Sequence, residues 1–427
     1  MSNLNIPLIR FTQYSDSWNL RPLSELIASV DSGWSPQCDD GSASMGEWGV
    51  LKTTSIQWTG FEPNQNKKLP YALEPRAKLS LSKNDILVTR AGPNERVGVV
   101  SIVNQDYPML MLSDKIIRLR ANAEVDPRYL ALNLSLKKSN YQIMRKASGL
   151  ATSQTNISQG FLLQTKLNVP ELPEQQKIAS FLSKVDEKIT LLTEKKAKLT
   201  EYKKGVMQQL FSGKWEDQNG QRTFIPPTLR FKADDGSEFP DWKEKTLGDV
   251  SESPSYGLNS AATKYDGLNK YIRITDIDED DRSFSPSPLT SPEEIDDAYL
   301  LEEGDIVFAR TGASVGKSYL YNKDDGRLMF AGFLIKFSVS KANPKFISYQ
   351  MTTSQYDNWV KVMSVRSGQP GINAQEYLTY PLNVPCTEEQ EQIANFLSAL
   401  DYKIDLTRSE LKKAKEWKKG LLQQMFV

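Results

Sequence analysis

Two arginines occupy the same place in two similar stretches of the chain. The runs DILVTR and DIVFAR each end in an arginine, Arg90 and Arg310, and a glycine follows two positions later, at Gly92 and Gly312. Each run predicts an apolar strand that closes on a tight turn and lifts the arginine to the surface. A guanidinium displayed in this way binds phosphate oxygens or the edge of guanine.

Further basic residues lie near glycine-rich turns and could contact phosphate or bases in the same way. Together with the two arginines, the candidate nucleic-acid contacts are Lys52, Lys67, Lys68, Arg90 and Arg96 in the first half and Arg273, Arg310, Lys317 and Arg366 in the second. Each one taken singly also fits an ordinary surface charge. For the two arginines, a structural ion pair with Asp85 or Asp305 would explain the same pattern.

The composition offers little catalytic chemistry. The chain has no histidine, which removes the commonest general base and metal ligand, and its two cysteines, Cys38 and Cys386, fit ordinary thiols of a reducing cytoplasm. The stretch GASVGKS has three residues between its glycines where a phosphate-binding loop has four. The carboxylates at 276 and 278–281 lack the calcium-loop spacing. We expect no catalytic residue, no metal site and no cofactor bound by this chain.

Charge is distributed unevenly although it sums to zero. Residues 1–170 carry 19 Lys/Arg and 14 Asp/Glu, whereas residues 215–386 carry 18 and 26. The first half could therefore hold phosphates by bulk charge, and the second would need a local basic face on an acidic body. No apolar run is long enough to span a membrane.

Two stretches, 171–213 and 387–427, repeat apolar residues in a 4-3 alternation that predicts long helices with a narrow apolar seam. A seam this narrow requires a partner helix. The predicted seam residues are Ile178, Leu182, Val185, Ile189, Leu192, Leu199, Val206 and Leu210 in the first helix and Ile393, Leu397, Leu400, Ile404, Leu411, Leu421 and Met425 in the second.

Landmarks of the first helix recur in the second, which indicates a tandem duplication. Glu174-Gln175 returns as Glu389-Gln390, and QQLF returns as QQMF. We expect two mixed α+β units, 1–170 and 242–386, each preceding its long helix, with a linker at 214–241. Asp126-Pro127 and Asn343-Pro344 predict the start of one helix in each unit, ending near 146 and 362. Thr387 and Gln390 predict a capping box.

The order of units and helices favours an antiparallel pair, about 48 Å long at ~1.5 Å per residue. Two units held by such a pair could touch one duplex roughly one turn apart. A coil that merely joins two subdomains, and a parallel coil between two chains, remain open.

The whole chain resembles the specificity subunit of type I restriction–modification enzymes. The resemblance rests on PEQQKIASFLSKVDEKI, TEEQEQIANFLSALDYKI, the QQLF and QQMF endings, the linker LRFKADDGSEFPDW and the R-x-G turns at Arg90 and Arg310. It implies an α+β fold with two target-recognition domains joined by a long antiparallel two-helix coiled coil.

The resemblance also implies a non-catalytic reader of double-stranded DNA in the cytoplasm. Each recognition domain would read one half of a bipartite site, and the coil would set the gap and dock two methyltransferase subunits. S-adenosylmethionine would belong to those subunits, and ATP and Mg to two restriction/translocase subunits. The alternative is an interaction scaffold that bundles proteins without reading DNA. The target sequence and the base-contacting residues do not follow from the chain alone.

Overall fold

The computed structural model describes residues 6–38, 41–147, 155–218 and 221–426. The chain divides into two compact units. Unit 1 comprises Met1–Thr193 and Ser409–Val427, and unit 2 comprises Glu194–Arg408. Each unit therefore takes one of the two repeats together with part of both long helices.

Unit 1 is built on an antiparallel four-stranded sheet of order β10-β8-β12-β2. Its strands are β2 (Ile27–Ser32), β8 (Ile86–Thr89), β10 (Val100–Ile102) and β12 (Ile116–Ala121). Apolar residues on β8 and β12 are fully buried because both strands are central. Arg90 therefore directly follows a strand that is buried in the core of unit 1.

A second sheet of unit 1 has the order β6-β3-β11-β7, and its β3–β11 pair is parallel. Smaller pairs join β1 to β14, β4 to β5 and β9 to β13. The strands are β1 (Asn19–Pro22), β3 (Gly49–Leu51), β4 (Ile56–Gln57), β5 (Gly60–Phe61), β6 (Asn66–Lys68), β7 (Ser80–Leu81), β9 (Ala91–Gly92), β11 (Tyr107–Met111), β13 (Thr155–Asn156) and β14 (Lys166–Val169).

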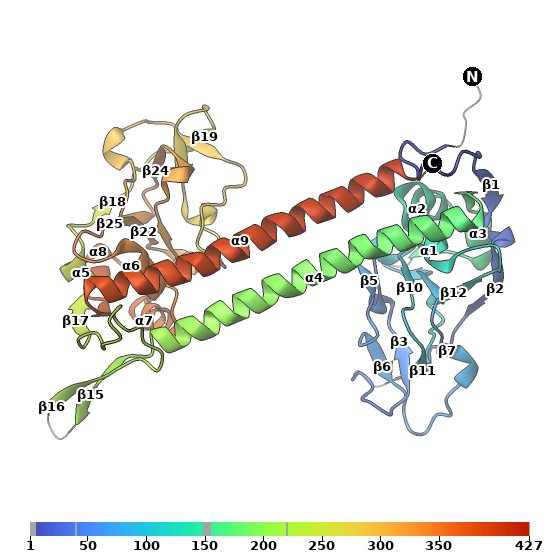
Figure 1. Cartoon of the computed structure of the whole chain (residues 1–427), viewed down its shortest axis with the longest axis horizontal. Helices are drawn as coiled ribbons and strands as arrows, with labels where there is room; N and C mark the ends of the chain where they lie inside the picture. The colour runs from blue at the N-terminus through green and yellow to red at the C-terminus, as the bar shows by residue number, and fades with distance from the viewer. Residues whose placement is uncertain (1–5, 39–40, 148–154, 219–220, 427) are drawn as a thin grey trace. The chain divides into compact units, whose positions relative to one another are not determined.

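Three short helices cover unit 1 before the long helix begins (Figure 1). They are α1 (Pro127–Ser135), α2 (Lys137–Met144) and α3 (Gln159–Leu163). The Asp126 carboxylate accepts hydrogen bonds from the first backbone N–H groups of α1, as its position before proline predicts. The single helix predicted up to residue 146 is instead two helices, because Leu136 adopts an extended conformation between them.

Unit 2 repeats the central sheet with the order β18-β25-β22-β23. A parallel pair, β20–β24, again accompanies it. The strands are β17 (Lys243–Thr246), β18 (Ser255–Tyr256), β19 (Ala262–Lys264), β20 (Lys270–Ile272), β21 (Thr290–Pro292), β22 (Asp305–Ala309), β23 (Ser318–Leu320), β24 (Leu328–Phe330), β25 (Leu334–Ser338) and β26 (Pro381–Val384). The duplication therefore extends from sequence to strand order.

The helices of unit 2 follow the same plan. They are α5 (Leu247–Val250), α6 (Pro344–Gln350), α7 (Ser354–Met363) and α8 (Ala374–Leu378). Asn343 caps α6 as predicted, but the helix does not continue to residue 362. A second helix, α7, begins at Ser354 instead. Thr353 is its N-cap residue, because the Thr353 hydroxyl accepts a hydrogen bond from the Tyr356 N–H.

The segment predicted as a linker, 214–241, carries structure of its own. Strands β15 (Lys214–Gln218) and β16 (Gln221–Ile225) form a hairpin. Phe224 is buried in the core of unit 2, and its ring lies 6.1 Å from that of Trp242. The apolar residues scattered among Gly and Pro thus make this stretch part of the second unit.

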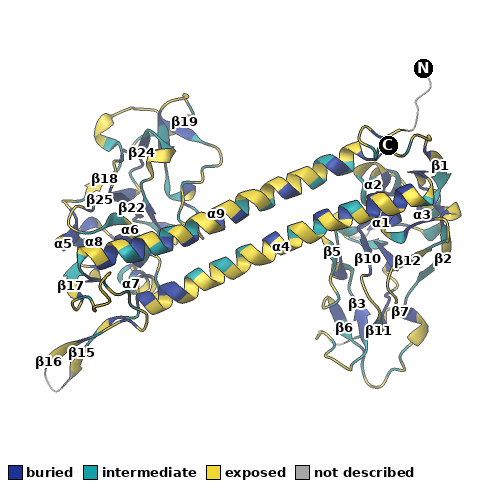
Figure 2. Cartoon of the chain, viewed as in Figure 1, coloured by how far each residue is buried: buried dark blue, intermediate teal, exposed yellow. Residues whose placement is uncertain are grey.

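The two long helices, α4 (Leu172–Leu210) and α9 (Thr387–Gln424), run antiparallel. In unit 1 the beginning of α4 packs with the end of α9, where Lys418 pairs with Asp186 at 2.5 Å. In unit 2 the end of α4 packs with the beginning of α9, where Lys203 pairs with Asp401 at 2.5 Å. The predicted seam residues are buried or half-buried, and Figure 2 shows exposed positions over much of the remaining helix surface.

Each long helix starts on the same polar anchor. In unit 1 the Arg10 guanidinium donates two hydrogen bonds of 2.7 Å to the buried Glu174 carboxylate. In unit 2 Arg230 donates two hydrogen bonds of 3.0 Å to Glu389, and the indole N–H of Trp242 donates to the same carboxylate. Buried charges require such pairing, so the repeated Glu-Gln landmark is a structural anchor.

The glutamine beside each anchor glutamate ties the long helix to the start of an earlier short helix, α1 in unit 1 and α6 in unit 2. Gln390 accepts from the Asn343 N–H (2.8 Å) and donates to the Pro385 carbonyl (2.9 Å). Gln175 accepts from the Asp126 N–H and donates to the Pro170 carbonyl in the same way. Gln390 was expected to close a capping box with Thr387; its amide bridges two elements instead.

Candidate nucleic-acid interface

The arginine turn of unit 1 is fastened on both sides by backbone hydrogen bonds. The Arg90 N–H donates to the Lys115 carbonyl (2.9 Å), and the Arg90 carbonyl accepts from the Ile157 N–H (2.8 Å). The Gly98 N–H closes the loop on the Thr89 carbonyl (2.8 Å). The turn is therefore a rigid projection from β8.

Unit 2 builds the same turn with equivalent bonds. The Arg310 N–H donates to the Phe333 carbonyl (3.1 Å), and the Arg310 carbonyl accepts from the Ile372 N–H (2.9 Å). The Gly316 N–H closes the loop on the Ala309 carbonyl (3.0 Å). The predicted correspondence of Arg90 with Arg310 thus holds at the level of individual backbone contacts. Of the matching return segment in unit 1, 148–154 lies outside the described residues.

Gly98 and Gly316 show why these turns need glycine. Both have positive φ, 77° and 88°, which side-chain-bearing residues rarely adopt. A Cβ atom at Gly316 would lie 2.6 Å from Val360 Cγ1, and one at Gly98 would lie 2.9 Å from Asn140 Nδ2. The turns therefore pack directly against α7 and α2.

Neither arginine pairs with the aspartate that opens its strand. Asp85 binds Arg120 at 2.8 Å and Arg118 at 3.3 Å. Asp305 accepts a hydrogen bond from the Ser338 hydroxyl (2.5 Å) and lies 3.4 Å from Lys336 Nζ. The alternative of an ion pair with Asp85 or Asp305 is therefore wrong for Arg90 and Arg310.

The two arginine side chains have different surroundings. The Arg310 guanidinium lies over the ring of Tyr256, 5.0 Å from its centroid. Arg90 has a buried Nε with no hydrogen-bond partner among the described residues. Both side chains are half-buried, so each turn offers a cation that is held but not neutralised by a described carboxylate.

The other candidates of unit 1 are spread over separate elements. Arg96 is structural, because its guanidinium donates to the Thr53 and Ile56 carbonyls at 2.8 and 3.0 Å. Lys68, at the end of β6, pairs with Glu47 at 2.6 Å. Lys52 and Lys67 are half-buried near the same sheet. The structure therefore does not bring all five predicted residues into one site around Arg90.

Three of the four unit 2 candidates are neutralised internally. They are Arg273, Lys317 and Arg366, which pair with Asp276 (2.8 Å), Glu279 (2.7 Å) and Glu376 (2.5 Å) respectively. The hydrogen bond from Lys317 is the main cause of a lowered pKa for Glu279. Arg310 is the remaining candidate, and no described carboxylate pairs with it.

The acidic stretch after β20 is a set of ion-pair partners. Asp281 binds Arg408 of α9 at 2.6 Å, and Glu279 binds Lys317 as described. Among the described residues, no group of three or more histidine, cysteine, aspartate or glutamate side chains is arranged to hold a metal ion. The glycine-rich stretch that ends at Lys317 begins with a short 3-10 turn, Gly312–Ser314.

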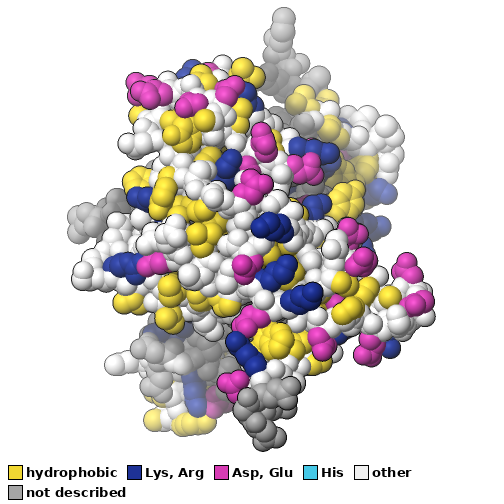
Figure 3. All heavy atoms as spheres, turned by 90° about the vertical axis from the view of Figure 1, so that its left-hand side faces the viewer, with side chains coloured by type: hydrophobic (Ala, Val, Ile, Leu, Met, Phe, Trp, Pro, Cys, Tyr) yellow, Lys and Arg dark blue, Asp and Glu magenta, His cyan; other side chains and the backbone are white. Residues whose placement is uncertain are grey.

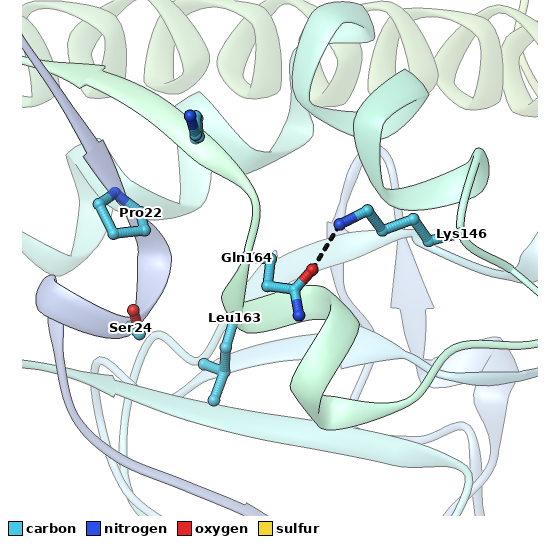
Figure 4. A pocket seen from close by; sticks show the side chains of 6 residues that line it. Pro22, Ser24, Lys146, Leu163 and Gln164 are labelled. Atoms are coloured by element: carbon cyan, nitrogen blue, oxygen red, sulfur yellow. Dashed lines mark hydrogen bonds between the residues drawn. The ribbon is translucent and has the colours of Figure 1, made fainter.

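The surface charge is mixed. On the face drawn in Figure 3, acidic and basic side chains interleave without a broad area of one sign. A pocket of unit 1 is lined by two lysines and, among the described residues, no carboxylate (Figure 4). It is lined by Pro22, Ser24, Lys146, Leu163, Gln164 and Lys166, and the Lys146 ammonium donates to the Gln164 amide oxygen at 2.5 Å. On the face drawn in Figure 3, a polyanion would therefore meet small basic areas and no broad basic surface.

Tyr256 is the neighbour of the arginine turn that sequence reasoning missed. Comparison of the repeats could not reveal it, because the aligned position in unit 1, one residue before Gly33, is Ser32. The matched glycines themselves are constrained, since a Cβ at Gly33 or Gly257 would overlap the backbone of Leu112 or Ala331. Only the fold shows that the residue before Gly257 reaches Arg310.

A family model described as "Type I restriction modification DNA specificity domain" matches residues 52–201 and 240–416. The chain belongs to this family. The two matched regions correspond to the two repeats, so the chain is a type I restriction–modification specificity subunit with two recognition domains.

Several curated relatives are specificity subunits. The chain is 39% identical over 165 residues to the Type I restriction enzyme EcoEI specificity subunit of Escherichia coli, a match that covers 38% of this chain and 28% of that protein. It is 24% identical over 362 residues to the MjaVIII specificity subunit of Methanocaldococcus jannaschii, covering 82% and 80%. A putative MjaX specificity subunit of the same organism is 25% identical over 96% of this chain and 93% of its own length.

Solved structures share the fold along the full chain. The S subunit of a type I restriction–modification system from M. genitalium matches with a TM-score of 0.62 at 18% identity and covers 99% of both chains. A chain from a study of complex assembly and conformational transition of the type I R-M system matches with a TM-score of 0.51 at 15% identity, covering 96% and 97%. Among the described residues, no helix has the length and apolarity needed to cross a membrane.

Proposed function

We propose that this chain reads a two-part double-stranded DNA site, with one half-site contacted by each recognition domain, and that it performs no chemistry itself. The observation that carries the proposal is the arginine turn, which both repeats build with equivalent hydrogen bonds from the Arg90 and Arg310 backbones. A rigid, repeated projection with an available guanidinium suits recognition of phosphate and base edges. Family membership supports the same function.

The proposal includes partner subunits that supply the chemistry. Two methyltransferase subunits would dock on the coil of α4 and α9 and bring S-adenosylmethionine, and two restriction/translocase subunits would bring ATP and Mg. One solved relative comes from a study of type I complex assembly. The assembly would act in the cytoplasm.

We propose that those cofactors bind to the partner subunits, and two observations on the described residues support this for ATP and Mg. Lys317, the lysine of the glycine-rich stretch, already binds Glu279, and the described carboxylates form no metal-binding group.

The test is to map methylated bases in cells that express the chain together with its methyltransferase partner. We expect a two-part motif with an unspecified gap, absent when the chain is deleted. Arg90→Ala should weaken selection at one half and Arg310→Ala at the other. A methylation pattern that does not depend on the chain would overturn the proposal and favour the scaffold alternative.

We further propose that the coil sets the gap between half-sites. Removing one heptad from α4 and one from α9 shortens the pair by about 10 Å, or roughly 3 base pairs. The mapped gap should shrink accordingly in a chain that still folds. A gap of unchanged length in that variant would rule out the coil as the ruler.

A further inference from the structure

Arg310 is held by an aromatic ring. Its guanidinium carbon lies 5.0 Å from the centroid of the Tyr256 ring. Tyr256 is 43% exposed and Arg310 is half-buried, so the pair lies at the surface. A guanidinium over a tyrosine face is attracted by the ring and keeps its N–H edges available for other acceptors.

The ring itself is fixed from two sides. Tyr256 pairs with Ile335 where β18 runs along β25, in the same sheet as β22, the strand that ends directly before Arg310. The tyrosine hydroxyl accepts a hydrogen bond from the Ala374 N–H at the start of α8 (3.3 Å). The ring therefore joins the sheet to α8 and presents a set face to the guanidinium.

Unit 1 has no such ring at the aligned position. Ser32 stands there, and its hydroxyl accepts a hydrogen bond from the Gln159 amide at the start of α3 (2.8 Å). The link from sheet to helix is thus kept in both units, although only unit 2 places an aromatic side chain in it. No aromatic ring of the described residues makes a cation–π contact with Arg90.

We propose that Tyr256 is a positioning residue that aims Arg310 at a guanine of the second half-site, an inference that rests on the proposed function. A phosphate contact needs a positive charge, whereas a bidentate contact with the O6 and N7 atoms of guanine needs a guanidinium in a fixed plane. Tyr256 supplies that plane. No described carboxylate occupies the guanidinium, in contrast to Arg273 and Arg366.

The experiment uses the full-length chain in complex with its methyltransferase partner. A duplex pool carries the mapped first half-site and gap, with random bases in the second half-site, and bound sequences are counted. The wild type should enrich guanine at one position. Arg310→Ala should reduce that preference by about tenfold to a hundredfold. Tyr256→Ser, which installs the residue of unit 1, should reduce it by about fivefold.

Tyr256→Phe is the matched control, because it keeps the ring and removes only the bond to Ala374. It should retain most of the guanine preference, and the affinity of every variant for duplex lacking the site should stay within about twofold. Equal losses in Tyr256→Phe and Tyr256→Ser would overturn the role of the ring. So would a Tyr256→Ser variant that selects guanine as the wild type does.

The outcome separates this inference from the proposed function. Undiminished guanine selection by Arg310→Ala, in a complex that still selects a two-part site, would overturn the inference and leave the function standing. A wild-type complex that selects no sequence from the pool would overturn both.

Discussion

Unit 1 and unit 2 share the backbone of the arginine turn and differ in what surrounds it. The turn hydrogen bonds, the Arg–Glu anchor and the glutamine bridge are repeated. The ring beside Arg310 and the carboxylates beside Lys317 and Arg366 belong to unit 2. The duplication has thus retained residues that hold the frame, while residues at the surface have diverged.

The largest expected effect tests whether the two frames are equivalent. Glu389→Ala leaves the Arg230 guanidinium and the Trp242 indole N–H without their buried acceptor, and Glu174→Ala does the same to Arg10. Each change should lower the free energy of unfolding by about 3–5 kcal/mol. Chemical denaturation measures it. The exposed neighbour Glu388→Ala is the control and should change stability by less than about 0.5 kcal/mol.

Unequal losses from the two anchor variants would show that the frames are not equivalent. A loss below about 1 kcal/mol in both would show that the paired carboxylates contribute little despite their burial.

A smaller effect should distinguish the turns. Gly316→Ala forces a Cβ into the left-handed region and against the branched Val360 side chain, at a cost of about 1–2 kcal/mol from the backbone alone. In Gly98→Ala the added Cβ meets the amide tip of Asn140, which can move. We therefore expect a smaller loss of unfolding free energy than in Gly316→Ala, measured by thermal denaturation of both variants. Gly160→Ala, where no described atom lies within 4 Å of the added Cβ, is the control. Reversal of this order would contradict the packing argument.

The charge difference between the units predicts a gain of binding. Glu279→Gln with Asp281→Asn releases Lys317 from its ion pair and removes the shorter of the two ion pairs of Arg408, which keeps its contact with Asp405 at 3.3 Å. Affinity for duplex DNA at low salt should rise by about threefold to tenfold, with a steeper salt dependence because Lys317 becomes available and Arg408 loses one of its two carboxylate partners. Fluorescence anisotropy across a salt series measures both.

The matched control is Glu293→Gln with Glu294→Gln. It makes the same change in net charge at exposed carboxylates that form no ion pair with the described residues. An equal gain in this control would attribute the effect to net charge alone.

The smallest effect concerns Lys68 in unit 1. Its hydrogen bond to Glu47 is the main cause that lowers the pKa of this carboxyl to about 2. Because the pKa is lowered in the folded state, the pairing is present above the ordinary glutamate pKa and is lost as pH falls through about 2. Carboxyl titration by NMR should show this, and Lys68→Met should return the pKa towards its usual value. An unshifted wild-type pKa would exclude the pairing in solution.

The duplication made the frame predictable. Repeated landmarks identified the long helices, the strands that end at Arg90 and Arg310, and the caps at Asp126 and Asn343, because each depends on local pattern. The two breaks in the short helices, at Leu136 and Thr353, depend on tertiary packing or on a second cap. They could not be read from apolar spacing.

The surroundings of the candidate contacts were less predictable. Arg366 and Glu376 are ten residues apart and Lys317 and Glu279 thirty-eight, so their pairing depends on the fold. The two arginines stood out because both repeats have them. Tyr256 could not be found in this way, because Ser32 occupies its position in unit 1. The role of Gln390 was misjudged because a capping box and a bridge between helices place glutamine at the same position.

The ring of Phe426, just beyond the end of α9, stacks on Tyr129 and makes an edge contact with Trp18 within the core of unit 1. Phe426 is far from both of these partners in the sequence. During synthesis, the first recognition domain therefore cannot complete its core until α9 and Phe426 have been translated. Its folding rate and its exposure to proteases should depend on how quickly the rest of the chain is translated.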